Sequence, residues 1–237
     1  MAGNTVEHHH PNVLFTFGRF QPPTIGHKVL IDFIKSRLDE TDGYVFVSSS
    51  LNKTRVPKDV FASSKQNENP LSVDHKVFYL KKMYPESTVK FINTTECDCT
   101  TIFKIIDKLK SAGYTGITMA VGSDRVESFQ KILRGVGVTV IPAGEARVVN
   151  ASNSTKAMSG TKMREAAVAG NIEAFKKGVL IGSMTDVDAM NLLNLVRQGL
   201  GYEPIVLGGS RKTRKYRKIR IKTRRSKRYR LRLEERT

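Results

Sequence analysis

The feature that most constrains the fold of this chain is a regular alternation between short apolar runs and longer amphipathic segments. The apolar runs are rich in β-forming residues and too short for helices, which indicates buried strands. They lie at residues 13–18, 44–48, 89–93, 117–122 and 136–142. The segments between them space their apolar residues as a helix does, and they lie at residues 27–38, 72–84, 100–112 and 124–133.

Strands that alternate with helices are joined by right-handed crossovers, which make the strands parallel and place helices on both faces of the sheet. The chain is therefore predicted to be an α/β protein with a doubly wound parallel sheet of about five strands. After Pro142 the alternation ends, and an extended piece at 147–150 precedes predicted helices at 162–169, 172–178 and 187–200. These helices predict a C-terminal extension of the α/β domain.

Two segments interrupt or flank this pattern. The stretch 51–71 is rich in Lys, Asn and Ser, and is long enough for an active-site lid or a disordered insertion. We divide the chain into a flexible lead-in (1–11), a folded domain (12–207) and a basic, disordered tail (208–237). The helix at 72–84 presents Val73, Val77, Phe78 and Leu80 as its apolar face, and His75 is interpreted as a structural residue of that helix.

The positive charge of the chain is concentrated in the tail. Of the formal net charge of +18, residues 209–237 contribute +13, from 15 Lys and Arg against two Glu. So dense a run of like charges repels itself and is predicted to be unfolded in isolation. The domain, with a net charge of +5, is only mildly basic.

The composition of the tail predicts non-specific binding of nucleic acid. Its cations can neutralise phosphates, and its tyrosines can stack on bases. The cations that open it are Arg211, Lys212, Arg214, Lys215, Arg217, Lys218 and Arg220. A nuclear localisation signal, an anchor for acidic partners and a solvated tail without a function are the alternatives.

Nothing in the sequence indicates a membrane or secreted protein. No apolar run approaches the ~18 residues of a membrane helix, and the N-terminus lacks the features of a signal peptide. The spacing of Cys97 and Cys99 fits neither an ordinary disulfide nor a four-ligand zinc site, so we expect reduced thiols in a cytosol-like compartment. The adjacent His8, His9 and His10 lack the spacing of metal ligands, and no protein metal site is expected. The expected location is the cytoplasm, with the nucleus or a virion as alternatives that the tail leaves open.

The segment Gly-Arg-Phe-Gln-Pro-Pro-Thr-Ile-Gly-His, residues 18–27, lies between the first predicted strand and the first predicted helix. In an open parallel sheet this turn lies at the carboxyl edge, where ligands bind. Gly18 lets the backbone approach a phosphate, and the helix that starts near Gly26 points its N–H groups at an anion. Thr24 and His27 lie one turn apart, so both side chains can face the same phosphate. The alternative is a prolyl turn followed by an ordinary surface histidine.

A second segment, Ser-Gly-Thr-Lys-Met-Arg at residues 159–164, opens a predicted helix. Ser159 and Thr161 offer hydroxyl and N–H groups at a helix N-terminus, and Arg164 lies one turn further along. This set can hold two phosphates of a triphosphate. The alternative for Ser159 is an ordinary helix cap.

A third segment, at residues 121–125, ends a predicted strand and begins a helix. Gly122 and Asp124 are candidates for contact with a nucleotide, although Ser123 as an N-cap and Asp124 in a first turn explain the segment equally well. Lys53 and Arg55 lie after the second strand, where they could reach phosphates or remain solvated loop charges.

The first two segments resemble the (His/Thr)-x-Gly-His and Ser-x-Thr-x-x-Arg signatures of the adenylyltransferase/cytidylyltransferase superfamily, whose members have a Rossmann-like fold. Residues 18–21 are especially similar to archaeal-type nicotinamide mononucleotide adenylyltransferases. The Pro-Pro-Thr at 22–24 is more similar to nucleotidyltransferase-like proteins of phages and large DNA viruses. The Arg-rich tail also resembles the tails of proteins of large DNA viruses, where it would serve packaging. Thr24 replaces the first His of the signature, a substitution that the superfamily tolerates. The resemblance covers residues 13–202.

The resemblance implies transfer of an NMP group, most simply AMP from ATP, to a small phosphorylated acceptor such as nicotinamide mononucleotide, with release of pyrophosphate. It implies catalytic roles for His27, Thr24 and Arg164, and Mg²⁺ bridged by substrate phosphates. The residues implied in nucleotide and phosphate binding are Gly18, Arg19, Phe20, Gly26, Gly122, Asp124, Ser159 and Thr161. Two alternatives remain: a cytidylyltransferase that uses CTP and a phospho-alcohol, and a nucleic-acid-binding or virion protein that retains the fold.

Overall fold

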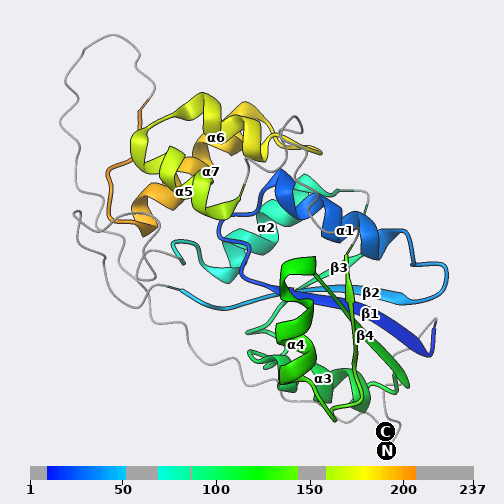
Figure 1. Ribbon diagram of the computed structural model, residues 1–237. Coiled ribbons are helices and arrows are strands. Elements are labelled where there is room, and N and C mark those ends of the chain that lie inside the picture. Colours follow the sequence, from blue (N-terminus) through cyan, green and yellow to red (C-terminus); the bar gives the residue numbers. More distant parts are fainter. Residues whose placement is uncertain (1–9, 52–68, 86, 144–158, 207–237) are drawn as a thin grey trace, which may run out of the picture. The chain divides into compact units, whose positions relative to one another are not determined.

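The computed structural model describes residues 10–51, 69–85, 87–143 and 159–206. Its centre is a sheet of five parallel strands in the order β3-β2-β1-β4-β5 (Figure 1). The strands are β1 (Asn12–Gly18), β2 (Asp42–Val47), β3 (Lys90–Asn93), β4 (Gly116–Val121) and β5 (Thr139–Pro142). The predicted α/β class with a doubly wound parallel sheet is confirmed.

The helices of the α/β part cover both faces of the sheet (Figure 1). They are α1 (Lys28–Lys35), α2 (Val73–Met83), α3 (Ile102–Ser111) and α4 (Val126–Ile132), with short 3-10 turns η1 (Ile25–His27) and η3 (Ser123–Arg125) before α1 and α4. Because side chains alternate along a strand, neighbouring residues of β1 serve opposite faces. Leu14 packs in the cluster that contains α1 and α2 residues, and Phe15 packs in the cluster that contains α3 residues.

Three further helices follow the sheet: α5 (Gly160–Ala169), α6 (Ile172–Val179) and α7 (Asp186–Gly199). Their apolar faces form one buried cluster with Tyr79 and Met83 of α2, so the predicted C-terminal helices pack onto the α/β part. An ion pair of 2.6 Å between Lys82 and Asp188 joins α2 to α7. The hydrogen bond from Lys82 and that from the Thr185 backbone lower the pKa of the Asp188 carboxyl.

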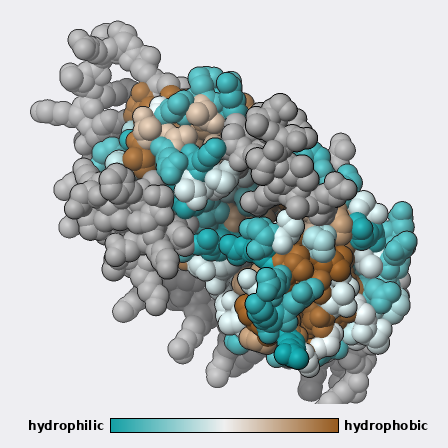
Figure 2. Space-filling model, viewed as in Figure 1, coloured by the Kyte–Doolittle hydropathy of each residue, from teal (hydrophilic) through white to brown (hydrophobic). Residues whose placement is uncertain are grey.

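The chain divides into two units, Met1–Ile205 and Val206–Thr237. None of the helices in the described residues is long and apolar enough to cross a bilayer. On the face shown in Figure 2, hydrophobic residues form separate groups among hydrophilic ones.

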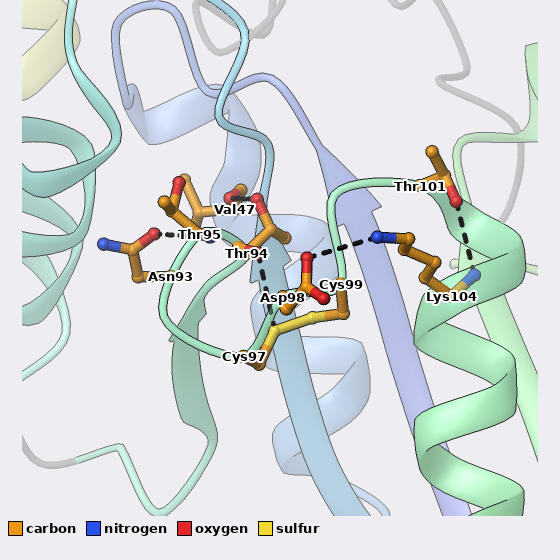
Figure 3. Close-up of a disulfide and its surroundings, with 9 residues drawn as sticks. All are labelled: Val47, Asn93, Thr94, Thr95, Cys97, Asp98, Cys99, Thr101 and Lys104. Atoms are coloured by element: carbon orange, nitrogen blue, oxygen red, sulfur yellow. Dashed lines mark hydrogen bonds and ion pairs between the residues drawn. A yellow bond between two sulfur atoms is a disulfide. The ribbon is translucent and has the colours of Figure 1, made fainter.

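The two cysteines contradict the prediction of free thiols, because the structure joins Cys97 and Cys99 in a disulfide (Figure 3). The turn after β3 folds back sharply there, with Asp98 at a φ of 46°. This reversal brings the two Cα atoms to 5.2 Å, within the usual range for a disulfide. The short spacing of the cysteines in the sequence does not show the effect of a left-handed residue between them.

Candidate active site

The candidate site lies at the carboxyl edge of the sheet, where β1 and β4 end side by side. β1 pairs with β2 on one side and with β4 on the other, so the chain reverses its direction of winding between β1 and β4. Ligands of open α/β sheets bind at such switch points. Gly18 ends β1 and Gly122 follows β4, so the first and third predicted segments both lie at this point.

The turn after β1 is shaped by two residues in unusual positions. Phe20 adopts a left-handed φ of 49°, which turns its ring back over Gly18. A Cβ on Gly18 would lie 2.9 Å from that ring, so the close approach requires glycine. Phe20 is buried, and its ring centroid lies 4.8 Å from that of His27. Phe20 therefore supports the histidine, while the neighbouring Arg19 is exposed.

The orientation of His27 is set by Thr24. The backbone N–H of Thr24 donates to Nδ1 of His27 at 3.0 Å, and the Thr24 hydroxyl lies 3.2 Å from the same nitrogen. Because Nδ1 accepts a hydrogen bond, the neutral imidazole carries its proton on Nε2. Nε2 is thus the nitrogen that can donate to a phosphate oxygen.

Thr24 contacts His27 from a buried position. Its exposed fraction is only 1%, and the preceding Pro22 and Pro23 are also buried. Thr24 therefore fixes the orientation of the imidazole through Nδ1.

Gln21 connects the turn to two other segments of the domain. Its side chain amide donates to the carbonyl oxygens of Ser50 at 3.1 Å and Leu71 at 2.8 Å, and accepts from the Leu71 N–H at 2.9 Å. Gln21 is buried, so these bonds are protected from water and rigidify the turn. Gln21 is not among the predicted site residues, because its partners lie far away in the sequence.

The second motif contacts the first directly. Arg164, which is 5% exposed, donates from Nη1 to the backbone oxygen of Gln21 at 2.7 Å and from Nη2 to the Thr161 hydroxyl at 3.2 Å. A Cβ on Gly160 would lie 2.7 Å from the same Gln21 oxygen. The N-terminus of α5 therefore abuts the turn that carries His27.

The remaining motif residues have ordinary local partners. Ser159 accepts from the Lys162 N–H at 3.3 Å and caps α5, as its alternative interpretation predicts. At the third segment Gly122, and not Ser123, occupies the N-cap position of η3. The exposed Asp124 follows in the first turn, so a carboxylate lies close to the end of β4.

Comparison with protein families matches residues 15–166 to the cytidylyltransferase-like family, a stretch that spans more than half of the chain and all three motifs. The chain belongs to the cytidylyltransferase-like family. This confirms the predicted superfamily, and the protein is a nucleotidyltransferase. No curated protein sequence matches this cytidylyltransferase-like chain.

Solved structures include a similar fold. The nicotinic acid mononucleotide adenylyltransferase of Plasmodium falciparum, complexed with NaAD, matches with a TM-score of 0.53 and 13% sequence identity. The match covers 78% of this chain and 97% of that chain. At this identity the similarity concerns the fold, and it agrees with the Rossmann-like sheet of the cytidylyltransferase-like domain.

Several predicted residues lie outside the described part of the chain. They are Lys53, Arg55, the segment 147–150, His8, His9 and the tail cations Arg211, Lys212, Arg214, Lys215, Arg217, Lys218 and Arg220. The described residues contain no group of three His, Cys, Asp or Glu side chains that could hold a metal ion.

Helix α2 of this cytidylyltransferase-like domain buries most of its predicted apolar face, because Leu80 is in the core and Val73 and Val77 pack against the same cluster. Phe78 and Lys76 are the exceptions. Phe78 is 52% exposed, and Lys76 is 0% exposed. Lys76 can be buried because its ammonium donates a hydrogen bond to the carbonyl oxygen of Ser48, just after β2. Burial, and secondarily the charge of Arg19, lowers the pKa of Lys76 to about 8. His75, interpreted as structural, is exposed.

Proposed function

We propose that the protein transfers an NMP group, most simply AMP from ATP, to a small phosphorylated acceptor and releases pyrophosphate. The observation that carries this proposal is the contact between the two phosphate motifs, in which Arg164 bonds the backbone of Gln21 at 2.7 Å. This contact places a helix N-terminus, an arginine and His27 around one edge of the sheet. Nicotinamide mononucleotide is a candidate acceptor, in line with the motif resemblance and with the substrate class of the Plasmodium enzyme.

The proposed reaction needs no protein nucleophile. A phosphate oxygen of the acceptor attacks the α-phosphorus in line, the bond to the β-phosphate oxygen breaks, and pyrophosphate leaves. Catalysis then consists of positioning and of stabilising the charge that builds on the leaving oxygens. His27 donates from Nε2 to that charge, Thr24 fixes the tautomer, and Arg164 with Thr161 and the N–H groups of α5 holds the pyrophosphate.

Gly18, Arg19 and Gly26 belong to the turn that approaches the phosphates in this proposal, and Gly122 with Asp124 faces the nucleoside. Mg²⁺ would enter with the triphosphate, bound by phosphate oxygens and water, as its preference for such ligands predicts. It would neutralise charge on the departing pyrophosphate. Binding of Mg²⁺ mainly by the substrate fits the groups at this edge of the sheet, which are cations and N–H groups together with the Asp124 carboxylate.

CTP with a phospho-alcohol acceptor is the second candidate, favoured by the cytidylyltransferase-like family match. A screen for pyrophosphate release decides between the two, with ATP and CTP each tested against nicotinamide mononucleotide, nicotinic acid mononucleotide and phosphorylated alcohols. We expect one donor to be preferred, and ATP with a mononucleotide to give the fastest release. Release only with CTP and a phospho-alcohol would replace the first assignment by the second.

The basic tail is proposed to bind nucleic acid independently of catalysis. A chain that ends at Gly208 lacks the tail's net charge of +13, and we expect it to keep its turnover on small acceptors. The full chain should bind DNA or RNA with little sequence preference, and if about five to ten phosphates are neutralised, log K should fall against log salt with a slope of about −4 to −9. Fluorescence anisotropy on both chains over a salt series measures this slope.

Truncation should remove nearly all of that binding. Salt-sensitive binding that persists in the truncated chain would place the nucleic-acid surface on the domain. It would favour the alternative of a nucleic-acid-binding protein that retains the fold, and the end of a nucleic acid would become a candidate acceptor.

A further inference from the structure

Lys76 is a buried cation at the edge of the sheet where the site lies. It projects from α2 with an exposed fraction of 0% and donates to the carbonyl oxygen of Ser48, the first residue after β2. An ammonium has three N–H groups, and among the described residues Ser48 is its hydrogen-bond acceptor. Burying a charge is costly unless another group compensates it, so this lysine needs an explanation.

The charges around Lys76 favour an anion. The Arg19 guanidinium, which follows β1, is close enough to lower the pKa of Lys76 further after burial has lowered it. The carboxylates of Asp74, on α2 itself, and of Glu96, in the turn after β3, both accept from the side chain amide of Asn93, at 2.8 and 3.3 Å. Two cations near each other repel, and an anion bound beside them offsets this repulsion.

Lys76 is also connected to the glycine that approaches the phosphates. The Ser48 carbonyl oxygen accepts from Lys76, and the Ser48 N–H donates to the carbonyl oxygen of Gly18 at 2.9 Å. Lys76 therefore holds the strand end against which Gly18 and Arg19 are positioned. Its charge lies behind the turn, inside the protein, where solvent screens it little.

We propose that Lys76 is a positioning residue for a substrate phosphate bound at Gly18 and Arg19. Lys76 holds the end of β2 in place beside these two residues, and its buried positive charge favours the binding of the phosphate. This inference deepens the proposed function, on which it rests, by assigning part of the phosphate affinity to a helix outside all three motifs. Protonated Lys76 strengthens phosphate binding, and by reciprocity a bound phosphate raises the pKa of Lys76. Affinity should therefore fall as the pH rises through about 8, the pKa of Lys76.

The direct test is an NMR titration of the full chain with ¹³Cε-labelled lysine. A resonance that titrates near pH 8 should be present in the parent protein and missing in Lys76→Met, which assigns it. Sulfate is a suitable first probe because it remains a dianion throughout this pH range. We expect saturating sulfate to raise the pKa of that resonance by about one unit, which corresponds to about tenfold tighter binding to the protonated form.

Two further probes distinguish the source of the phosphate. A non-hydrolysable ATP analogue with Mg²⁺ tests the donor, and ribose 5-phosphate tests the acceptor. The probe that raises the pKa of Lys76 more identifies the phosphate held there. If none of the three probes shifts the resonance, Lys76 has no role in phosphate binding and the inference is wrong.

Stability separates this role from a purely structural one. We expect Lys76→Met to melt at the same temperature as the parent or higher, since apolar replacement of a buried charge is often stabilising, while its affinity for the preferred probe falls about tenfold at pH 7. Lys76→Arg should keep that affinity and lose the dependence on pH above 8. Lys131→Met, on an exposed residue of α4, is the control for the loss of one charge and should change neither property.

A Lys76→Met protein that is less stable and binds as the parent does would assign a structural role only. These measurements report binding and not turnover. They can therefore fail while pyrophosphate release succeeds, or succeed while no acceptor supports turnover, so the inference and the proposed function are tested separately.

Discussion

Replacement of His27 by Ala is expected to lower turnover by about 10²-fold or more, because a preorganised donor to developing charge contributes a few kcal/mol to the barrier. In the proposed mechanism this donor is Nε2, since Nδ1 accepts from the Thr24 N–H at 3.0 Å. Steady-state pyrophosphate release measures the effect. The loss should appear in kcat more than in KM, because the contact strengthens as the leaving oxygen becomes negative.

Two isosteric variants distinguish the roles of the two ring nitrogens of His27. His27→Asn places an oxygen near the position of Nδ1 and keeps the contact with Thr24, whereas His27→Gln places an amide near the position of Nε2. We expect Gln to retain more turnover than Asn or Ala. The control is His75→Ala, because His75 is an exposed histidine of α2. Turnover of His27→Ala within a few-fold of the parent would remove His27 from the mechanism.

Replacement of Arg164 by Ala is expected to weaken triphosphate binding by about 10- to 150-fold, which corresponds to the ~1.5–3 kcal/mol of a hydrogen bond to a charged group. The buried guanidinium joins the two motifs through Gln21 and Thr161, so its loss removes a charge and loosens the turn. Affinity for the acceptor should change much less. Titration calorimetry with a non-hydrolysable triphosphate measures the first effect and titration with the acceptor alone measures the second.

Arg197 provides the matched control. It lies on α7 and donates to the carbonyl oxygens of Ala167 and Val168 at the other end of α5. Arg197→Ala should lower the melting temperature and leave triphosphate affinity unchanged. If Arg164→Ala binds the triphosphate as tightly as Arg197→Ala does, Arg164 has only a structural role.

The fold could be predicted because its signals are local. β1 is a single apolar run, all of whose residues from Val13 to Thr16 are buried, and Ile31 and Ile34 of α1 repeat at helical spacing on its buried face. A period of two or of 3.6 residues is legible within one short segment. The ends of the helices and strands were harder to predict. The last strand was predicted to begin at residue 136, but β5 begins at Thr139, because Gly137 adopts a left-handed φ of 77°.

The details of the site depend on contacts between distant segments, and these could not be predicted. Gln21 meets Leu71 across 50 positions and Arg164 meets Gln21 across 143. The burial of Lys76 could not be predicted either, because a lysine is rarely buried and is typical of an exposed helix face. Only the position of Ser48 shows why it is buried.

The most direct test of the proposed reaction follows two labels of one triphosphate. The full chain is incubated with Mg²⁺, the acceptor that gives the fastest pyrophosphate release, and ATP or CTP carrying ³²P at the α- or the γ-phosphate. An NMP transfer moves the α-label into a new product and the γ-label into pyrophosphate, in equal amounts, and His27→Ala suppresses both. A γ-label that appears in the acceptor or in orthophosphate, or an α-label that remains in the nucleotide, would contradict the account.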